Sequence, residues 1–518
     1  MKILEYLRLK NINQIQSPCG GKGTCKKCMV KILQNGVERQ VLACQTEYEA
    51  DMTVVLSDEN DENQMKIIHS GITRQRVKNR VDGIVAACDI GTTTVVCHLV
   101  DGATGKVIST VAYPNKQRSF GADVISRIEA ATHGKLGEMQ SAIIRQIQSM
   151  LGECLKKSEH ESEKIKCLSV AGNTVMCHIF AGISPQSIGK APFLPQEYFG
   201  KNYSGEALNL EMVDQVYIAP AVSGYVGGDI TSDMLALSAI MNDGEEVGLQ
   251  KAGQFRGYDG KQSSWKSCET LILDIGTNGE MVLGKPGDYT CCATAAGPAF
   301  EGAEIELGMP AMAGAISKVW LEDDHIGVSV IGDDDVGKVT AARGICGTGL
   351  VDAIAIFLEM GLIDETGRIM THREIPYKYY SYLGDEEEEN DCIFLTDEVY
   401  VTQEDIRKLQ LAKGAIAAGI KVLMNARNVT CDDIEKVIIA GGFGSVLDKK
   451  SAVRIGLIPT ELLGKTEAIG NAAAEGAILA AISEDVREEL DKIKASMTYI
   501  ELSAEESFSE EYIRQINF

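Results

Sequence analysis

The sequence contains no run of about 18 apolar residues, the length that a membrane-spanning helix requires. Its start mixes charged and apolar side chains and lacks the apolar segment and small-residue cleavage site of a secretory signal. Basic residues are also few: 50 Lys and Arg stand against 74 Asp and Glu, so the formal net charge is −24. Because nucleic-acid phosphates are bound by dense basic surfaces, we expect a cytoplasmic protein with no membrane span and no nucleic-acid partner.

The composition is that of an ordinary globular protein, with 45% apolar and 24% charged residues. The length of 518 residues is enough for roughly two to four domains with a large core. There are 15 cysteines, but the chain is far longer than the small secreted modules that disulfides hold together. Four cysteines are spaced like metal ligands. The others mostly sit in apolar runs and are interpreted as small buried hydrophobic residues.

The four spaced cysteines form the pattern C-x5-C-x2-C, followed after fifteen residues by a fourth. Thiolates favour soft metals, and the glycines between the first two cysteines allow a loop to wrap a cluster and point N–H groups at its sulfurs. A structural zinc site is the alternative, although zinc ribbons usually present two short C-x2-C pairs. The spacing favours a [2Fe-2S] cluster. The predicted ligands are Cys19, Cys25, Cys28 and Cys44.

A strand, a tight turn and a returning strand are predicted for residues 84–100. Apolar residues lead into Asp-Ile-Gly-Thr-Thr-Thr, and a second apolar run follows at once. The glycine lets the backbone approach a ligand, and the threonines offer hydroxyl and N–H groups to an anion. The aspartate, at the end of the strand, is suited to hold a hydrated Mg²⁺ beside phosphates. These candidate binding residues are Asp89, Gly91, Thr92, Thr93 and Thr94.

The same strand–turn–strand pattern recurs at residues 271–283, and an apolar strand followed by Gly-Gly-Phe-Gly lies further along the chain. A single Asp-x-Gly-Thr is a weak signal, because many hairpins contain Asp and Gly. Two copies together with the later glycine turn indicate a specific site rather than chance. The additional candidates are Asp274, Gly276, Thr277, Asn278, Gly279, Gly441, Gly442, Phe443 and Gly444.

Small residues also open a predicted helix at residue 347. The N-terminus of such a helix is a ready anion site, which makes Gly347 a candidate binding residue. Close packing of the helix explains the small residues equally well, and the sequence does not decide between the two.

The cysteine-rich stretch, including Leu42-Ala-Cys44-Gln45, resembles the ferredoxin domain of the plant and adrenodoxin type. Domains of that type begin with a β-hairpin before the helix, whereas this chain starts at a predicted helix over residues 2–10. The resemblance therefore implies a truncated ferredoxin-like (β-grasp) domain over residues 1–57. A polar, acidic stretch then predicts a linker over residues 58–82.

Residues 83–518 resemble the acetate and sugar kinase/Hsp70/actin superfamily, in which a duplicated α/β body binds nucleotide in the cleft between its halves. The resemblance implies two lobes, at about residues 83–268 and 269–518. It identifies the first Asp-Ile-Gly-Thr segment as phosphate motif one and the second as phosphate motif two. By the same resemblance, residues 441–444 match the adenosine motif, and ATP or ADP with Mg²⁺ is the expected ligand.

More narrowly, the whole chain resembles the reductive activators of corrinoid proteins. The matching stretches include Asp-Ile-Gly-Thr-Thr-Thr-Val, Gly-Ala-Asp-Val-Ile-Ser-Arg-Ile, Val-Ser-Gly-Tyr-Val-Gly-Gly-Asp and Gly-Pro-Ala-Phe-Glu-Gly-Ala. The resemblance implies ATP-dependent transfer of one electron from the [2Fe-2S] cluster to the Co(II) corrinoid of a methyltransferase corrinoid protein, which restores Co(I). It also implies a low-potential donor, a ferredoxin or flavodoxin, and a homodimer.

We expect Asp89 and Asp274 to position Mg²⁺, mainly through water, and either Glu280 or Asp229 to orient the attacking water. Glu280 could equally be a strand residue in an ion pair. One rival function is that of a small-molecule kinase with an accessory iron–sulfur domain. A second is an activator of 2-hydroxyacyl-CoA dehydratases, but these hold a [4Fe-4S] cluster between subunits. A simple electron carrier would not need two phosphate hairpins.

Overall fold

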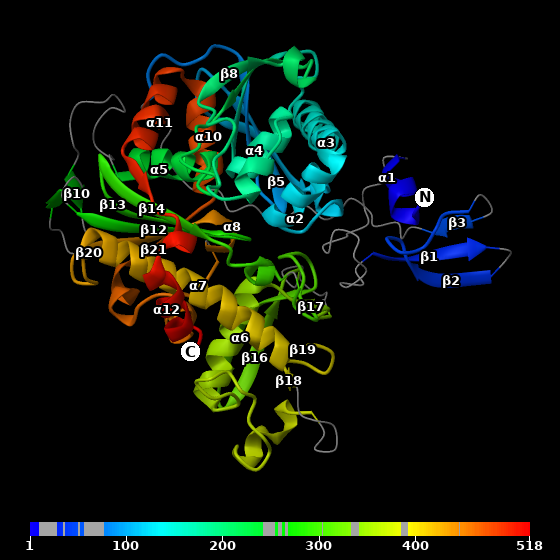
Figure 1. Ribbon diagram of the computed structural model, residues 1–518, viewed down its shortest axis with the longest axis vertical. Helices are drawn as coiled ribbons and strands as arrows, with labels where there is room; N and C mark the ends of the chain where they lie inside the picture. The colour runs from blue at the N-terminus through cyan, green and yellow to red at the C-terminus, as the bar shows by residue number, and fades with distance from the viewer. Residues whose placement is uncertain are drawn as a thin grey trace. The chain divides into compact units, whose positions relative to one another are not determined.

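The structure is a computed structural model, in which some segments are not described. The described residues are 1–9, 28–34, 37–49, 52–55, 77–241, 254–256, 262–264, 268–302, 304–332, 341–384, 392–444 and 446–518. They form two compact units (Figure 1). Unit 1 comprises the described residues within Met1–Gln64, Val77–Ser232 and Gly476–Leu490; unit 2 comprises those within Asp233–Glu475 and Asp491–Phe518. Of the predicted linker, residues 58–76 lie outside the described part.

The N-terminal part of unit 1 is a helix beside a small antiparallel sheet with strand order β2-β1-β3. Its elements are α1 (Ile3–Leu9), β1 (Met29–Gln34), β2 (Val37–Leu42) and β3 (Met52–Val55). Buried and exposed residues alternate along β1, so one face of the sheet meets the apolar side chains of α1. Cys28 and Cys44 belong to this small core. The predicted helix at the start of the chain is confirmed, whereas the ferredoxin-like topology stays a prediction.

The large sheet of unit 1 has the strand order β6-β5-β4-β7-β9-β8. The first three strands form an antiparallel meander, β7 and β9 add in parallel, and β8 closes the edge in antiparallel orientation. The strands are β4 (Ile84–Ile90), β5 (Thr94–Asp101), β6 (Val107–Pro114), β7 (Ile165–Gly172), β8 (Lys201–Ser204) and β9 (Val213–Ile218). The helices are α2 (Val124–Ala130), α3 (Leu136–Lys157), α4 (Thr174–Ala181) and α5 (Gly228–Met241), the last of which begins in this unit.

Unit 2 contains a sheet of the same design, with strand order β21-β20-β12-β13-β14-β22. Again a three-stranded antiparallel meander is extended by two parallel strands, and β22 joins the outer edge of β14 in parallel. The repeat confirms the predicted duplicated α/β body. The strands are β12 (Glu269–Ile275), β13 (Gly279–Lys285), β14 (Asp288–Thr294), β20 (Ile434–Ala440), β21 (Thr466–Gly470) and β22 (Met497–Tyr499).

The remaining strands and helices of the described part of the chain are the following. The strands are β10 (Gln254–Arg256), β11 (Gln262–Ser264), β15 (Ala315–Glu322), β16 (His325–Val330), β17 (Gly344–Ile345), β18 (Cys392–Phe394) and β19 (Tyr400–Thr402). The helices are α6 (Gly347–Met360), α7 (Gln403–Arg427), α8 (Gly441–Gly444), α9 (Lys449–Arg454), α10 (Ala472–Ile482), α11 (Asp485–Ala495) and α12 (Glu506–Gln515). Among the described residues, no helix is both long and apolar enough to cross a membrane.

The long helix α7 packs against β13 and β14, and α12 packs along α7 (Figure 1). A capping box starts α7: the Thr402 hydroxyl accepts the Asp405 N–H at 3.1 Å, and the Asp405 carboxylate accepts the Thr402 N–H at 3.1 Å. These two bonds satisfy backbone donors that the first turn leaves open. The spacing Thr402-Gln-Glu-Asp405 in the sequence is typical of a capping box, and the helix that it starts ends at Arg427.

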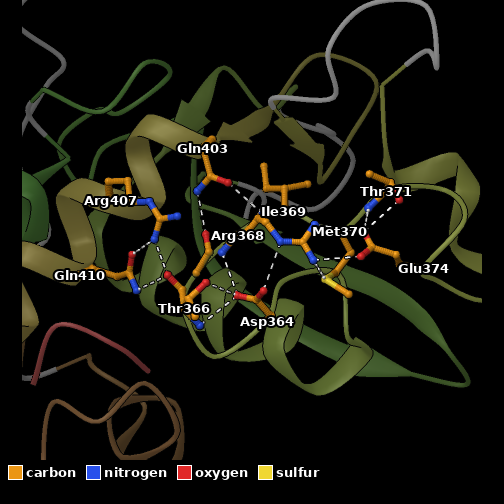
Figure 2. A network of polar contacts seen from close by, with 11 residues as sticks. Asp364, Thr366, Arg368, Ile369, Met370, Thr371, Glu374, Gln403, Arg407 and Gln410 are labelled. Carbon is orange, nitrogen blue, oxygen red and sulfur yellow. Dashed lines mark hydrogen bonds and ion pairs between the residues drawn. The ribbon is translucent and has the colours of Figure 1, made fainter. Parts of the chain in front are cut away.

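A polar network fixes the loop after α6 onto the first turns of α7 (Figure 2). Gln403 accepts the Ile369 N–H at 2.9 Å and donates to the Gly367 carbonyl at 2.7 Å. Within the loop, both Nη atoms of Arg368 donate to the carboxylate of Glu374 at 3.0 Å, and this pairing lowers the pKa of Glu374 to about 2. The ion pair of Arg368 and Glu374 is exposed, whereas the bonds of Gln403 are partly buried and hold the loop on α7.

A buried lysine on α7 holds the C-terminal segment of unit 2. The side chain of Lys413 is 1% exposed, its Nζ donates to the Asn517 carbonyl and it lies 5.4 Å from the centre of the Phe518 ring. Burial disfavours the charged amine and lowers the pKa of Lys413 to about 8.

This depressed pKa predicts an alkaline rise in stability. Between about pH 8 and the ordinary lysine value near pH 10.4, the unfolded chain keeps a proton that the folded chain has lost, so the free energy of unfolding increases with pH. Below pH 8 both states are protonated and the full cost of burying the charge remains. Lys413→Met should remove this dependence, measured by urea unfolding at pH 7.5 and pH 10. Lys421→Met, an exposed position of α7, should retain it because the buried amine is still present.

Candidate functional site

Three polar residues gather at one edge of the large sheet of unit 1. Asp89 lies near the end of β4, and Asn173 directly follows β7, the parallel neighbour of β4. Asp229 stands in the first turn of α5, which follows β9, the next parallel strand. Adjacent parallel strands present their carboxyl ends at the same edge of a sheet, where α/β proteins bind ligands. The structure thus brings the predicted residues Asp89 and Asp229 to one edge.

Asp229 has an unusual charge environment. Its carboxylate accepts the Ile230 N–H at 2.8 Å, and the side chain is only partly exposed. Burial, and then the negative charge of Asp89, raise the pKa of Asp229 to about 7. Two carboxylates that influence each other in this way are typical of functional sites, although structural pairs do the same.

The first predicted phosphate loop, residues 89–94, is held by side chains that the sequence leaves unassigned. Asn115 Nδ2 donates to the Gly91 carbonyl at 2.8 Å, and the Asn115 N–H donates to the Thr93 carbonyl at 2.7 Å. Arg127 donates to the Thr92 carbonyl. Asn173 Nδ2 donates to the Thr92 hydroxyl at 3.1 Å, while its Oδ1 caps α4 through the Met176 N–H. Arg127 lies in the stretch Gly-Ala-Asp-Val-Ile-Ser-Arg-Ile that carries part of the family resemblance, but no pattern in the sequence links it to the loop.

The second loop, in unit 2, also has a carboxylate beside it. The Thr277 hydroxyl donates to Glu301 Oε2 at 2.7 Å, and the Gly276 N–H donates to the Asn278 carbonyl at 2.9 Å. Glu301 ends a short 3₁₀ turn, Pro298–Glu301. The sequence leaves Glu301 unassigned, because a Gly-Pro-Ala-Phe-Glu-Gly segment is equally typical of a plain turn.

The glycine turn after β20, residues 441–444, packs closely against the second predicted loop at Asp274. Gly441 has a φ of +85°, and a Cβ at this position would lie 2.4 Å from Asp274 Oδ1. Only glycine therefore allows the turn and the carboxylate to approach so closely. The ring of Phe443 packs against the ring of Phe300, with centroids 5.2 Å apart, and contacts the core of unit 2. The role of residues 441–444, including Gly442 and Gly444, in nucleoside binding stays a prediction.

Two further predicted residues lie against the core of unit 2. Glu280, 5% exposed, stands opposite Asp274 in the β12–β13 pair, so both side chains point to the same face of the sheet. A Cβ at Gly347 would lie 1.7 Å from the Phe300 carbonyl oxygen. Close packing therefore explains this glycine, and its predicted contact with an anion remains untested.

Two of the four predicted cluster ligands are described, and they converge. Cys28 is fully buried, Cys44 is 7% exposed, and their sulfurs lie 3.1 Å apart. Gln45 Nε2 approaches the Cys44 sulfur at 3.7 Å, the kind of N–H donor that tunes iron–sulfur clusters. Two soft donors side by side fit an iron site. Cys19 and Cys25 lie outside the described residues. Among the described residues, no group of three or more His, Cys, Asp or Glu side chains is arranged to hold a metal.

A second pair of close thiols lies in the sheet of unit 1. Cys88 and Cys97 face each other across β4 and β5 with sulfurs 3.3 Å apart, and both are fully buried. Burial raises the pKa of Cys88 well above its ordinary value, so the thiol stays protonated and unreactive. This environment agrees with the interpretation of the remaining cysteines as hydrophobic core residues.

Comparison with known proteins places the chain among characterised families. Residues 269–518 match the family described as "C-terminal domain of RACo the ASKHA domain", and residues 84–241 match the "RACo middle region". A solved structure described as "Reductive activator for corrinoid,iron-sulfur protein" is 29% identical, covers 100% of this chain and 95% of its own, and superposes with a TM-score of 0.71. The chain belongs to the family of reductive activators of corrinoid proteins.

Two curated relatives agree with this assignment to the reductive activators. The "Corrinoid activation enzyme RamQ" of Eubacterium limosum is 29% identical over 96% of this chain and 93% of its own length. The "[Co(II) methylated amine-specific corrinoid protein] reductase" of Methanosarcina barkeri is 23% identical over 83% of this chain and 76% of its own.

The matched regions include both phosphate loops. The first loop and Asp229 fall within the middle region, whereas the second loop, Glu280 and residues 441–444 fall within the C-terminal domain. The four predicted cluster cysteines precede both regions.

Proposed function

We propose that this protein is an ATP-dependent reductase of a corrinoid protein, which transfers one electron from a [2Fe-2S] cluster to Co(II) and restores Co(I). The observation that carries the proposal is the combination of two phosphate loops, one in each unit, with the converging thiols of Cys28 and Cys44 in one chain. The reported names of the relatives describe corrinoid activation and reduction, which supports this substrate class.

The need for ATP follows from the direction of the electron transfer. Plant-type [2Fe-2S] centres have potentials of about −400 mV, and the resemblance implies that the Co(II)/Co(I) couple lies lower. Each ~59 mV uphill costs about tenfold in the equilibrium of a one-electron step. ATP binding and hydrolysis can overcome such a gap where they shift an equilibrium between two conformations that differ in affinity for the partner.

The residues take the following proposed roles. Asp89 and Asp274 position Mg²⁺ through water, and the N–H and hydroxyl groups of the two loops bind the phosphates. Asp229 accepts the proton of the attacking water, since its carboxylate lies at the same sheet edge as Asp89 and can serve as a general base. Cys28 and Cys44, with Cys19 and Cys25, would hold the cluster, which would supply one-electron transfer between a ferredoxin or flavodoxin and the corrinoid protein. We also propose a homodimer.

The test is performed on protein purified without oxygen. We expect iron and sulfide in equal amounts, the visible absorption of a [2Fe-2S] centre and an EPR signal on reduction. With a low-potential donor and a Co(II) corrinoid protein, Co(I) should form with ATP and not with a non-hydrolysable ATP analogue. Iron-free protein would overturn the redox role, and equal Co(I) formation without nucleotide would overturn the role of ATP. Phosphorylation of an added acid or sugar would favour a kinase instead.

A further inference from the structure

Arg127 is a fully buried guanidinium directly behind the first phosphate loop. Its exposed fraction is 0%. Nε donates to the Gly121 carbonyl at 3.0 Å, Nη1 to the Met176 sulfur at 2.9 Å and Nη2 to the Thr92 carbonyl. One of these acceptors, the Thr92 carbonyl, belongs to the first predicted phosphate loop, so Arg127 connects this loop to α2.

The helix that carries Arg127 is fixed at its start. Asp123 caps α2 by accepting the Ser126 N–H at 2.7 Å, and the Ser126 hydroxyl accepts the Asp123 N–H at 3.2 Å. A Cβ at Gly121 would lie 2.3 Å from the Ser126 hydroxyl oxygen, so the chain before the helix packs closely against it. Arg127 therefore approaches the loop from a rigid support.

The hydrogen bonds behind the loop determine where its N–H groups point. In a trans peptide the C=O and N–H bonds point in opposite directions, and the described peptides here are trans. The Thr92 carbonyl is turned toward Arg127, so the Thr93 N–H is turned away from it. The Gly91 carbonyl is turned toward Asn115, so the Thr92 N–H is turned away as well. Successive N–H groups of this kind form anion-binding nests.

We propose that Arg127 is a positioning residue of the first phosphate loop. By holding the Thr92 carbonyl it aims the N–H of the Thr92–Thr93 peptide at the bound phosphates. The proposal rests on the proposed nucleotide function and deepens it, because it identifies the group that makes this turn bind a phosphate.

Arginine is suited to this position because the three nitrogens of its planar guanidinium group can donate to several acceptors at once, which the single ammonium group of lysine cannot do in the same geometry. Arg127→Lys keeps a charge but loses the planar group, and Arg127→Met loses both. We expect ATP affinity to fall by about 10-fold in Arg127→Lys and about 100-fold in Arg127→Met, the range for losing hydrogen bonds to a charged group.

Arg487 provides a matched control within unit 1. It is 6% exposed and makes similar hydrogen bonds: Nε donates to the Ala480 carbonyl at 2.9 Å, Nη2 to the Cys167 sulfur at 3.1 Å and Nη1 to Asn202 Oδ1 at 3.0 Å. Arg487 also pairs with the carboxylate of Glu484 at 3.6 Å. Since none of these acceptors belongs to a phosphate loop, Arg487→Lys should lower thermal stability to a similar degree and leave ATP affinity unchanged.

The readout is the affinity for AMP, ADP and ATP, measured by displacement of a fluorescent ATP analogue. We expect the Arg127 variants to lose more affinity for a nucleotide the more phosphates that nucleotide carries, so that ATP is affected most and AMP least. Folded Arg127→Lys protein that binds ATP within twofold of wild type overturns the inference, as does an equal loss for all three nucleotides or for Arg487→Lys. A wild-type protein that binds no ATP overturns the proposed function instead.

Hydrogen exchange on the wild-type protein gives a second measurement, which needs no variant to fold. Inorganic pyrophosphate with Mg²⁺ should slow exchange at the amides of Thr92 and Thr93, because these N–H groups bind the anion. If pyrophosphate binds and the Thr93 amide exchanges as before, the peptide orientation assigned to Arg127 is wrong.

Discussion

Asp229→Asn is expected to lower ATP turnover by about 100-fold or more and to leave ATP affinity near the wild-type value. General base catalysis contributes about 10²- to 10⁴-fold to a rate, and an amide does not accept the proton. Asparagine has the same shape and still accepts the Ile230 N–H that Asp229 binds at 2.8 Å, so the start of α5 should stay intact. Turnover is measured as phosphate release, and affinity by nucleotide displacement.

Asp448→Asn is the matched control for this prediction. Asp448 is also an aspartate at a helix start, where it accepts two N–H groups of α9 at 2.9 Å, and asparagine caps helices as well as aspartate does. Its turnover should equal that of the wild type. Glu280→Gln tests the other carboxylate: a large loss in Glu280→Gln together with normal turnover in Asp229→Asn would assign the water-orienting role to Glu280.

The sequence predicts the parts of this site that depend on neighbours along the chain. Apolar runs broken by Asp-x-Gly-Thr predict the strands and turns of β4–β5 and β12–β13, and Thr402 with Asp405 predicts the start of α7, because each signal extends over only a few residues. The duplicated α/β body was predicted from the two hairpins and from the resemblance of their sequences to the acetate and sugar kinase/Hsp70/actin superfamily.

The residues that hold the loops were not predictable in this way. Arg127 lies 35 residues from Thr92 in the sequence, Asn173 lies 81 residues from it, and Glu301 lies 24 residues from Thr277. These contacts exist only because the strand order places separate segments at one edge of each sheet. Local sequence also left the role of Gly347 open, and the contact with the Phe300 carbonyl shows packing that no local pattern indicates.

Cys44→Ala is expected to remove the [2Fe-2S] signals and to lower Co(II) reduction to the background rate, with ATP affinity unchanged. An iron–sulfur cluster of this type needs four ligands, and Cys44 supplies one of the two described thiols that converge, 3.1 Å from the Cys28 sulfur. Iron content, visible absorption and EPR report the cluster, while nucleotide displacement reports the two phosphate loops independently.

Cys97→Ala is the control that separates loss of the cluster from the loss of stability caused by removing any buried thiol. Cys97 is as buried as Cys28 and has its own close partner, Cys88, with sulfurs 3.3 Å apart, but it lies in the large sheet of unit 1. The variant should lose some stability and keep its full iron content. If Cys44→Ala retains iron and reduces Co(II) as the wild type does, Cys44 is not a cluster ligand. If Cys97→Ala loses iron to the same extent, the loss in Cys44→Ala reflects destabilisation, because a thiol in the sheet of unit 1 is no part of the predicted ligand set.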